Sequence, residues 1–207
     1  MPRRRGAGVS RRRVTVLLFE DFEALDVFGP VELFSHVPGW TVEYAGPDAE
    51  PVTTSQGTAV LTTRRWQELT AGTDILLVPG GMGTRVLAED ADFLRMLRGV
   101  AEEAHLLASV CTGSALLAAA GLLEGREATS NKRAFAWASA FGDRVRWRRR
   151  ARWTRDGHIW TSSGVAAGMD MAAALIRAEE GDETARELLR AVELEVQNDP
   201  TRDPFAG

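Results

Sequence analysis

Cysteine, lysine and tyrosine are nearly missing from this sequence of 207 residues, in which each occurs once. The single cysteine, Cys111, excludes an internal disulfide framework and fits a reducing compartment. No apolar run reaches the roughly 18 residues that a membrane-spanning helix needs. No long apolar stretch follows the basic segment 1–13 either, which argues against a secretory signal. We therefore expect a cytoplasmic protein without a membrane partner.

Metal-binding patterns are also missing. The three histidines are His36, His105 and His158, and no spacing of His, Cys, Asp or Glu resembles a metal site. His105 opens the predicted strand whose far end carries Cys111, which places the two about 20 Å apart at about 3.3 Å per residue. The sequence therefore predicts no metal and no Cys–His pair.

Positive charge is present but not in excess, since the net charge is −4. All basic residues except Lys132 are arginines. The basic segment 1–13 is predicted to be a disordered tail, and residues 14–207 are predicted to form a single domain. A tail arginine can touch nucleic acid, but a solvated tail is the simpler interpretation.

The stretch RVRWRRRARW, residues 144–153, interleaves tryptophans with arginines, as some surfaces that bind single-stranded nucleic acid do. Strand alternation explains the pattern more simply, with Val145, Trp147 and Trp153 on one face. We therefore expect no nucleic-acid partner.

Apolar runs alternate with helical patterns along the chain. The runs at 14–19 and 105–110, and the one that opens 73–83, are typical of strands buried on both faces. Helices are predicted at 30–37, 90–104, 112–123, 132–142, 168–181 and 182–197. This alternation predicts an α/β fold, a flavodoxin-like three-layer sandwich with a mainly parallel sheet. Such sheets bind ligands at the carboxyl ends of their strands.

Cys111 lies where a predicted strand becomes a helix. The small residues Thr112, Gly113 and Ser114 follow it, as the sharp turn of a nucleophile elbow requires. A helix N-terminus favours negative charge, so we expect a lowered thiol pKa. A buried structural cysteine is an equally good explanation of the local sequence.

Two further strand ends carry unusual residues. Gly80, Gly81 and Gly83 follow a buried strand and let backbone amides approach a bound group, as an oxyanion site requires, although a tight turn explains them too. Asp26 is an acid among apolar residues in a loop before the helix 30–37. It is either a helix cap or a carboxyl near the thiol, with a raised pKa and a general-acid role.

These motifs together resemble the ThiJ/PfpI superfamily, which has the class I glutamine-amidotransferase-like fold. The resemblance covers nearly everything from Val14 onward. Within it, LDVFGPVELF and CTGS are similar to the isonitrile hydratase branch. The segments that carry the resemblance are FEDFEALDVFGPVELF, DILLVPGGMGTR, SVCTGSALLAAAGLLEGREATSNKRAFAW, RARWTRDGHIWTSSGVAAGMDMAAALI and DPFA.

The resemblance implies roles for three residues: Cys111 as nucleophile, Asp26 as the catalytic aspartate and Thr112 as the threonine after the nucleophile. Amides of Gly80, Gly81 and Thr112 are the candidate oxyanion donors. The candidates for the substrate pocket are Gly83, Asn131 and Trp137, although Trp137 fits a core position equally well.

Two departures from relatives weaken other activities of the superfamily. Protease-like and glyoxalase-like relatives have a histidine directly after the cysteine, where this chain has Thr112. Other relatives have a histidine in the strand after the elbow helix, where this chain has Asn131. Some isonitrile hydratases carry TTH where this chain reads TSN, so the substrate stays open.

The resemblance therefore implies a cysteine-dependent hydratase that converts a small isonitrile to an N-substituted formamide, without a cofactor and as a homodimer. Another thiol-dependent hydrolase or lyase acting on small carbonyl compounds is the alternative enzyme. A redox sensor that uses an exposed low-pKa thiol is the alternative without turnover. Regulators that use this fold append a helix-turn-helix domain, for which we expect no room in 207 residues.

Overall fold

A seven-stranded sheet forms the centre of the protein in a computed structural model that describes residues 11–69 and 72–206. The strand order is β10-β11-β7-β6-β1-β2-β5, and all neighbours are parallel except β10 and β11. The strands are β1 (Arg12–Leu17), β2 (Trp40–Gly46), β5 (Arg64–Arg65), β6 (Ile75–Val78), β7 (Leu106–Ser109), β10 (Trp153–Asp156) and β11 (Ile159–Ser162).

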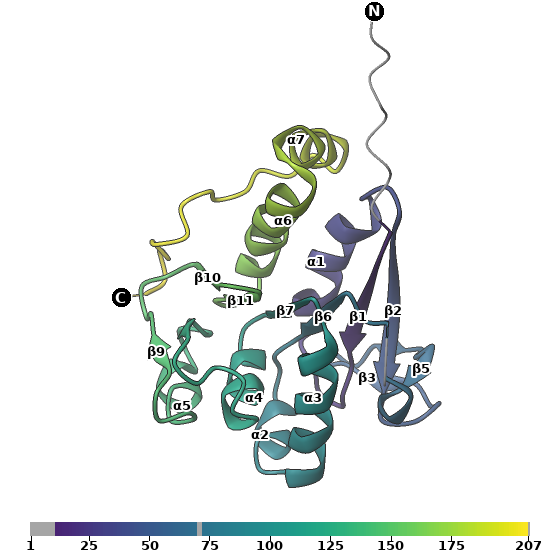
Figure 1. Cartoon of the computed structure of the whole chain (residues 1–207), viewed down its shortest axis with the longest axis vertical. Helices are drawn as coiled ribbons and strands as arrows, with labels where there is room; N and C mark the ends of the chain where they lie inside the picture. The colour runs from purple at the N-terminus through teal and green to yellow at the C-terminus, as the bar shows by residue number, and fades with distance from the viewer. Residues whose placement is uncertain (1–10, 70–71, 207) are drawn as a thin grey trace, which may run out of the picture.

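Helices cover both faces of this sheet, which makes three layers (Figure 1). On one face lie α1 (Ala24–Ser35), α6 (Ala167–Glu180) and α7 (Asp182–Ala191). On the other lie α2 (Thr84–Leu87), α3 (Ala91–Glu103) and α4 (Gly113–Ala119). The predicted flavodoxin-like sandwich with a mainly parallel sheet is confirmed.

The core strands are apolar on both sides because helices cover both faces. Every residue of β6 and β7 is buried, and Ile75 pairs with Leu106 in parallel register. Parallel register brings the carboxyl ends of β6 and β7 side by side at one edge of the sheet, so Val110 donates its N–H to the Val78 carbonyl at 3.0 Å. The glycine turn and Cys111 therefore emerge next to each other.

Helix α1 differs from its prediction because it begins at Ala24 and contains Pro30. Asp26 therefore lies in its first turn instead of in a preceding loop. This part of α1 packs closely against α6. A Cβ on Gly29 would lie 2.8 Å from the Met169 side chain, and one on Gly168 would lie 3.3 Å from Pro30.

The N-terminal boundary differs as well. Strand β1 begins at Arg12, where it pairs with Trp40 of β2. Most of the predicted tail, residues 1–10, lies outside the described residues.

The remaining elements are short. They are β3 (Val52–Thr53) with β4 (Ala59–Val60), β8 (Glu127–Ala128) with β9 (Arg146–Trp147), η1 (Trp66–Glu68) and α5 (Phe135–Ala138). The predicted turn at Asp156 and Gly157 is confirmed, since β10 and β11 form an antiparallel pair there and Gly157 has a φ of 64°.

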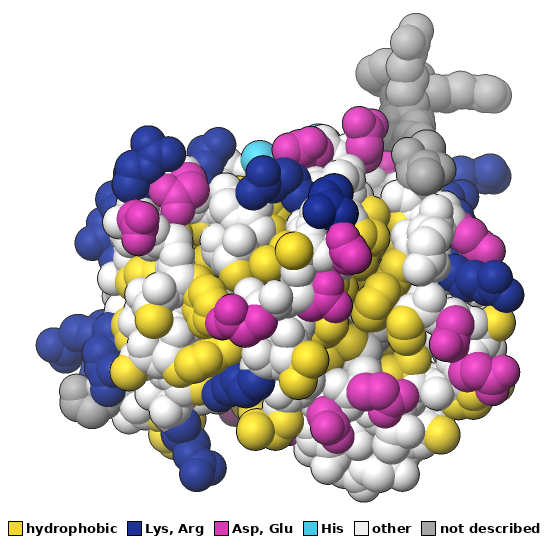
Figure 2. Space-filling view, turned by 90° about the horizontal axis from the view of Figure 1, so that it is seen from below, with side chains coloured by type: hydrophobic (Ala, Val, Ile, Leu, Met, Phe, Trp, Pro, Cys, Tyr) yellow, Lys and Arg dark blue, Asp and Glu magenta, His cyan; other side chains and the backbone are white. Residues whose placement is uncertain are grey.

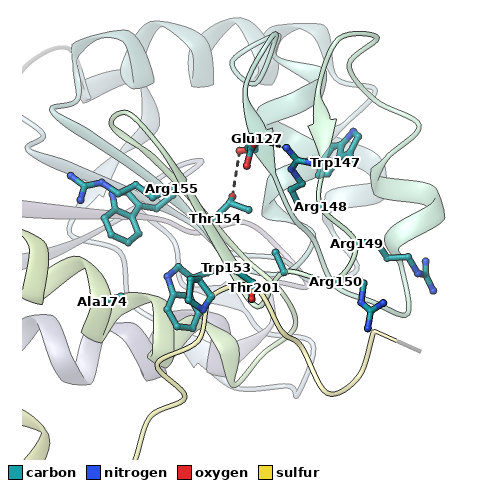
Figure 3. A pocket seen from close by; sticks show the side chains of 13 residues that line it. Glu127, Trp147, Arg148, Arg149, Arg150, Trp153, Thr154, Arg155, Ala174 and Thr201 are labelled. Carbon is teal, nitrogen blue, oxygen red and sulfur yellow. Dashed lines mark hydrogen bonds and ion pairs between the residues drawn. The ribbon is translucent and has the colours of Figure 1, made fainter.

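The arginine-rich segment does not form the single alternating face that the sequence predicts. Trp147 belongs to β9 and Trp153 to β10, in two different sheets, because the chain turns between them. Both tryptophans still line one cavity of about 690 Å³. Figure 3 shows Arg148 reaching Glu127, with which it forms an ion pair, whereas Arg149 lies away from Trp153.

Acidic and basic side chains are interspersed over the face that Figure 2 shows, with no continuous basic track across it. Among the residues that the structure describes, no helix has the length and apolar character required to span a bilayer.

Candidate active site

Cys111 occupies a strained turn between β7 and α4, with a φ of 58°. This left-handed backbone conformation is unusual for a residue other than glycine. Its N–H donates to the carbonyls of Ser163 at 2.9 Å and Ser162 at 3.2 Å. Its own carbonyl accepts hydrogen bonds from the hydroxyls of Ser114 and Ser130, both at 3.0 Å. The backbone is thus fixed on both sides, as expected for a nucleophile elbow, and the predicted elbow is confirmed.

Gly113 is required by the close approach of two strand ends. A Cβ there would lie 2.3 Å from the Val78 carbonyl oxygen and 2.7 Å from that of Pro79. Real Cβ atoms do not approach backbone oxygens this closely, so a larger residue would push α4 away from β6.

Asp26 is completely buried beside the elbow. Its Oδ2 accepts the N–H of Gly80 at 2.9 Å, and the Gly80 carbonyl accepts the N–H of Glu23 at 2.9 Å. The other carboxyl oxygen, Oδ1, has no conventional hydrogen-bonding partner among the described residues, and the Cys111 thiol is the polar group that interacts with this carboxyl. The structure thus brings the predicted thiol and acid together.

Thr112 connects the elbow to the glycine turn. Its hydroxyl oxygen accepts the N–H of Gly81 at 3.1 Å and the hydroxyl of Thr84 at 3.2 Å. Both candidate oxyanion amides of the glycine turn are therefore occupied, Gly80 by Asp26 and Gly81 by Thr112. The turn holds the catalytic candidates in place, and the amides of Thr112 and Val165 point to the sulfur of Cys111.

Burial and the nearby Asp26 raise the pKa of the Cys111 thiol to about 12, although the Thr112 and Val165 donors oppose the shift. Burial also raises the pKa of Asp26 to about 7; the N–H of Gly80 opposes this shift and the charge of Glu23 adds to it. The expected low thiol pKa is therefore wrong for the resting protein. Desolvation of the sulfur and the nearby carboxyl group raise the thiol pKa by more than the N-terminus of the short helix α4 lowers it.

Above pH 7 the pair thus holds one proton, on the sulfur, with an ionised carboxylate next to it. That carboxylate can accept the proton when the sulfur forms a bond and can return it afterwards. The arrangement supports nucleophilic attack that is coupled to proton transfer.

A cavity of about 730 Å³ opens above Cys111. Of the predicted pocket residues, Asn131 and Trp137 line it. Gly83 does not, because it packs behind the turn, where a Cβ would lie 2.0 Å from the Glu20 carbonyl. No histidine lines this cavity, and no group of metal-binding residues occurs among the described residues.

The sequence analysis missed several residues that line this cavity, among them Glu23, Arg85, Arg133 and Val165. Arg85 follows the predicted glycine turn by two residues, which was the available indication of its position. The other three reach the cavity from the residue before α1, the segment before α5 and the loop after β11, and no local pattern distinguishes them.

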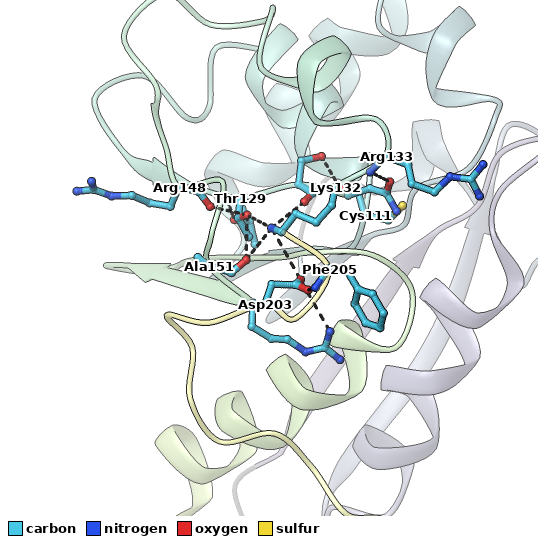
Figure 4. Close-up of polar contacts among 12 residues, drawn as sticks. Cys111, Thr129, Lys132, Arg133, Arg148, Ala151, Asp203 and Phe205 are labelled. Carbon is cyan, nitrogen blue, oxygen red and sulfur yellow. Dashed lines mark hydrogen bonds and ion pairs between the residues drawn. The ribbon is translucent and has the colours of Figure 1, made fainter. Parts of the chain in front are cut away.

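The only lysine of the sequence, Lys132, forms a buried polar network next to the site. Its Nζ donates to the Ala151 carbonyl at 2.7 Å and to the Thr129 hydroxyl at 2.8 Å, and it lies 3.9 Å from Asp203 (Figure 4). Burial lowers the pKa of Lys132 to about 8, although Asp203 opposes the shift. This network attaches the C-terminal DPFA segment to the strand end that carries Ser130.

Comparisons with known proteins agree with this architecture. The model of the DJ-1/PfpI family matches residues 12–178. The isonitrile hydratase of Pseudomonas putida is 34% identical over 179 residues, which cover 84% of this chain and 75% of that protein.

Solved structures give the same result. A ThiJ/PfpI family protein from Pseudomonas syringae has a TM-score of 0.80 at 27% identity, over 91% of this chain and 77% of that one. Drosophila melanogaster DJ-1beta shares the fold, with a TM-score of 0.79 at 20% identity, over 90% of this chain and 100% of that one. The resemblance inferred from the sequence motifs is confirmed, and this chain belongs to the DJ-1/PfpI family.

Proposed function

We propose that this protein hydrates isonitriles to N-substituted formamides, with Cys111 as the nucleophile and Asp26 as the proton carrier. The observation that carries the proposal is the buried carboxyl beside a thiol that opens into a cavity. The similarity to the Pseudomonas putida isonitrile hydratase supports the choice of substrate.

In the first half of the reaction, Asp26 removes the thiol proton while the Cys111 sulfur bonds to the terminal isonitrile carbon. The protonated carboxyl then delivers that proton to the same carbon. The product is a neutral thioimidate, in which one S–H bond has been exchanged for one S–C and one C–H bond. Asp26 is ionised again at the end of this half.

In the second half, water adds to the thioimidate carbon. Asp26 accepts a proton from the water and passes it to the imine nitrogen, so that a neutral tetrahedral intermediate forms and Asp26 is ionised again. Its C–S bond then breaks, the hydroxyl proton returns through Asp26 to the Cys111 sulfur, and the formamide leaves. Negative charge develops on the oxygen as the hydroxyl proton leaves. The Thr112 amide, which points to the Cys111 sulfur in the resting protein, is the candidate donor to that oxygen, and such a donor contributes about 2.7–4 kcal/mol in comparable sites.

The alternatives have less support from the geometry. The described residues that line the cavity include no histidine to act as a base toward a carbonyl substrate. A redox sensor needs an exposed thiolate, whereas Cys111 is buried and its pKa is raised to about 12.

The direct test is an assay of the purified protein on a panel of alkyl and aryl isonitriles, with formamide formation followed by chromatography. Glyoxal and small esters form the second panel. We expect turnover of isonitriles and none of the carbonyl compounds. Turnover of glyoxal without any formamide would assign the protein to the alternative enzyme class.

The pH dependence of kcat/KM tests the role of Asp26. The carboxyl group must be ionised to accept the thiol proton. We therefore expect kcat/KM to rise with pH, with a midpoint near the Asp26 pKa of about 7, and to level off above it. Glu23 raises that pKa through its charge, so Glu23→Gln moves the midpoint to lower pH. Glu32→Gln, on the exposed side of α1, is the control and leaves the midpoint in place. A rate that falls with pH over this range would assign Asp26 the opposite role.

A further inference from the structure

Arg85 lies on the wall of the Cys111 cavity in a fixed position. The carbon of its guanidinium lies 3.8 Å from the centroid of the Trp137 ring, and Nη1 donates to the Thr84 hydroxyl at 3.0 Å. Trp137 is in turn held by an edge contact with Phe141, with ring centroids 5.1 Å apart. The guanidinium is thus a preorganised part of the wall that also contains Cys111.

No carboxylate compensates this cation within ion-pair distance among residues 11–69 and 72–206. Glu23 lines the same cavity and keeps its charge, but it is not within ion-pair distance of Arg85. Gln56 Nε2 donates to both of its carboxylate oxygens at 2.9 Å. Burial lowers the pKa of Arg85, whereas the charge that Cys111 carries when it ionises raises it, so the two groups lie within electrostatic reach of each other.

A second arginine joins this wall. Arg133 lines the cavity and also has no ion-pair partner among the described residues. Figure 4 shows its side chain extending past Cys111 on the side to which the sulfur points. Two guanidinium groups that have no ion-pair partner in the described part of the chain therefore line the cavity with the nucleophile, and one of them is stacked on Trp137. Such a pair suits a carboxylate, which arginine binds through paired N–H donors.

We propose that Arg85, with Arg133 beside it, forms an anion subsite, so that the substrate carries a carboxylate on the end away from the reacting carbon. For the reaction proposed above, on which this inference rests for the reactive group, the substrate class is a short isocyano carboxylate. Its isonitrile carbon meets Cys111 while its carboxylate meets Arg85. The cavity of about 730 Å³ has room for both ends.

Alkylation of Cys111 tests the subsite without any isonitrile. Iodoacetate and iodoacetamide differ in charge but hardly in size, and the chain has one thiol, so mass spectrometry reports one reaction. The ratio of the two rates cancels any change in thiol ionisation. We expect Arg85→Met to lower the iodoacetate-to-iodoacetamide ratio at least about tenfold, as loss of one charge-assisted contact implies.

Two variants serve as controls. Arg95→Met removes an equal charge on the exposed side of α3 and should leave the ratio within about twofold, since distant surface charges are screened. Arg85→Lys keeps the charge without the planar fork and should give an intermediate ratio. Circular dichroism confirms that each variant is folded. A ratio that is equal in the native protein and in Arg85→Met would overturn the subsite.

Turnover separates this inference from the proposed function. We expect kcat/KM to be about tenfold higher for 3-isocyanopropanoate than for 3-isocyanopropanamide. In Arg85→Met this preference should be lost, because the KM for the carboxylate rises. If neither compound is hydrated while the alkylation ratio still depends on Arg85, the hydratase fails and the subsite stands. If both compounds are hydrated equally and the alkylation ratio does not change in Arg85→Met, the proposed subsite is wrong and the proposed hydratase activity is supported.

Discussion

Replacing Asp26 with Asn is expected to lower kcat/KM for isonitrile hydration about 10³-fold, because the amide can neither accept the thiol proton nor return it. The side chain keeps its shape, so the carbonyl of the new amide can still accept the Gly80 N–H. The measurement is formamide formation at pH 8, with Cys111→Ala defining the background rate. A variant that keeps more than about a tenth of the native rate would remove Asp26 from the proton-transfer steps.

The same substitution is expected to stabilise the fold at neutral and higher pH. The folded protein holds the Asp26 proton more tightly than the unfolded chain, since its pKa is raised from 3.8 to about 7. Stability is therefore lost as the pH rises from about 4 to about 7. One pKa unit corresponds to about 1.4 kcal/mol, so the full shift corresponds to about 4 kcal/mol.

Thermal and urea denaturation of Asp26→Asn and the native protein can measure this effect. We expect the free energy of unfolding to be higher in the variant by up to about 4 kcal/mol at pH 8, with little difference at pH 4. A group that is retained although its charge destabilises the fold is typical of a functional site. Equal stability of the two proteins at pH 8 would show that the carboxylate is solvated in solution.

Gly80→Ala is expected to lower kcat/KM at least about 10²-fold without changing any catalytic side chain. The new Cβ would lie 2.6 Å from the Thr112 nitrogen, 2.7 Å from its hydroxyl oxygen and 2.8 Å from Asp26 Oδ2. One or both of these groups must move, and a displacement of about 1 Å near the reacting atoms costs about this factor. The overpacking should also destabilise the fold by about 1–3 kcal/mol.

Gly99→Ala is the matched control for this prediction. Gly99 lies on the exposed side of α3, and a Cβ there has no neighbour within 4 Å. The same substitution should leave activity unchanged and stabilise the fold by about 0.5–1 kcal/mol, because alanine favours helix. Kinetics and thermal denaturation of the two variants can be compared directly. A Gly80→Ala protein with native kcat/KM would mean that the turn does not position Asp26 and Thr112.

Local patterns determined much of the architecture. The apolar runs of β6 and β7 are buried at every residue. The helix predicted over 90–104 is α3, which begins at Ala91 after Asp90 caps it by accepting the N–H groups of Asp92 and Phe93. These features follow from the sequence because an apolar run or a cap acts within a few residues.

The elbow was also predictable, since the small residues after Cys111 leave room for the turn. The direction in which the pKa of Cys111 shifts was not predictable, because it is set by burial and by the charge of Asp26, which lies 85 positions earlier in the chain. Similarly, the residues that share hydrogen bonds at the site are separated by 54 positions for Gly80 and Asp26 and by 31 for Gly81 and Thr112.

The sequence by itself thus determined the fold class and the elbow, and it predicted the thiol, the acid and the threonine of the candidate site. Only the tertiary structure decided that Asp26 lies in a helix, that the glycine amides bind catalytic candidates, and that Arg85 stacks on Trp137 with no carboxylate of the described residues in ion-pair distance. The physical reason is range: propensity and periodicity act between neighbours in the chain, whereas desolvation and charge pairing depend on which distant segments the fold packs together.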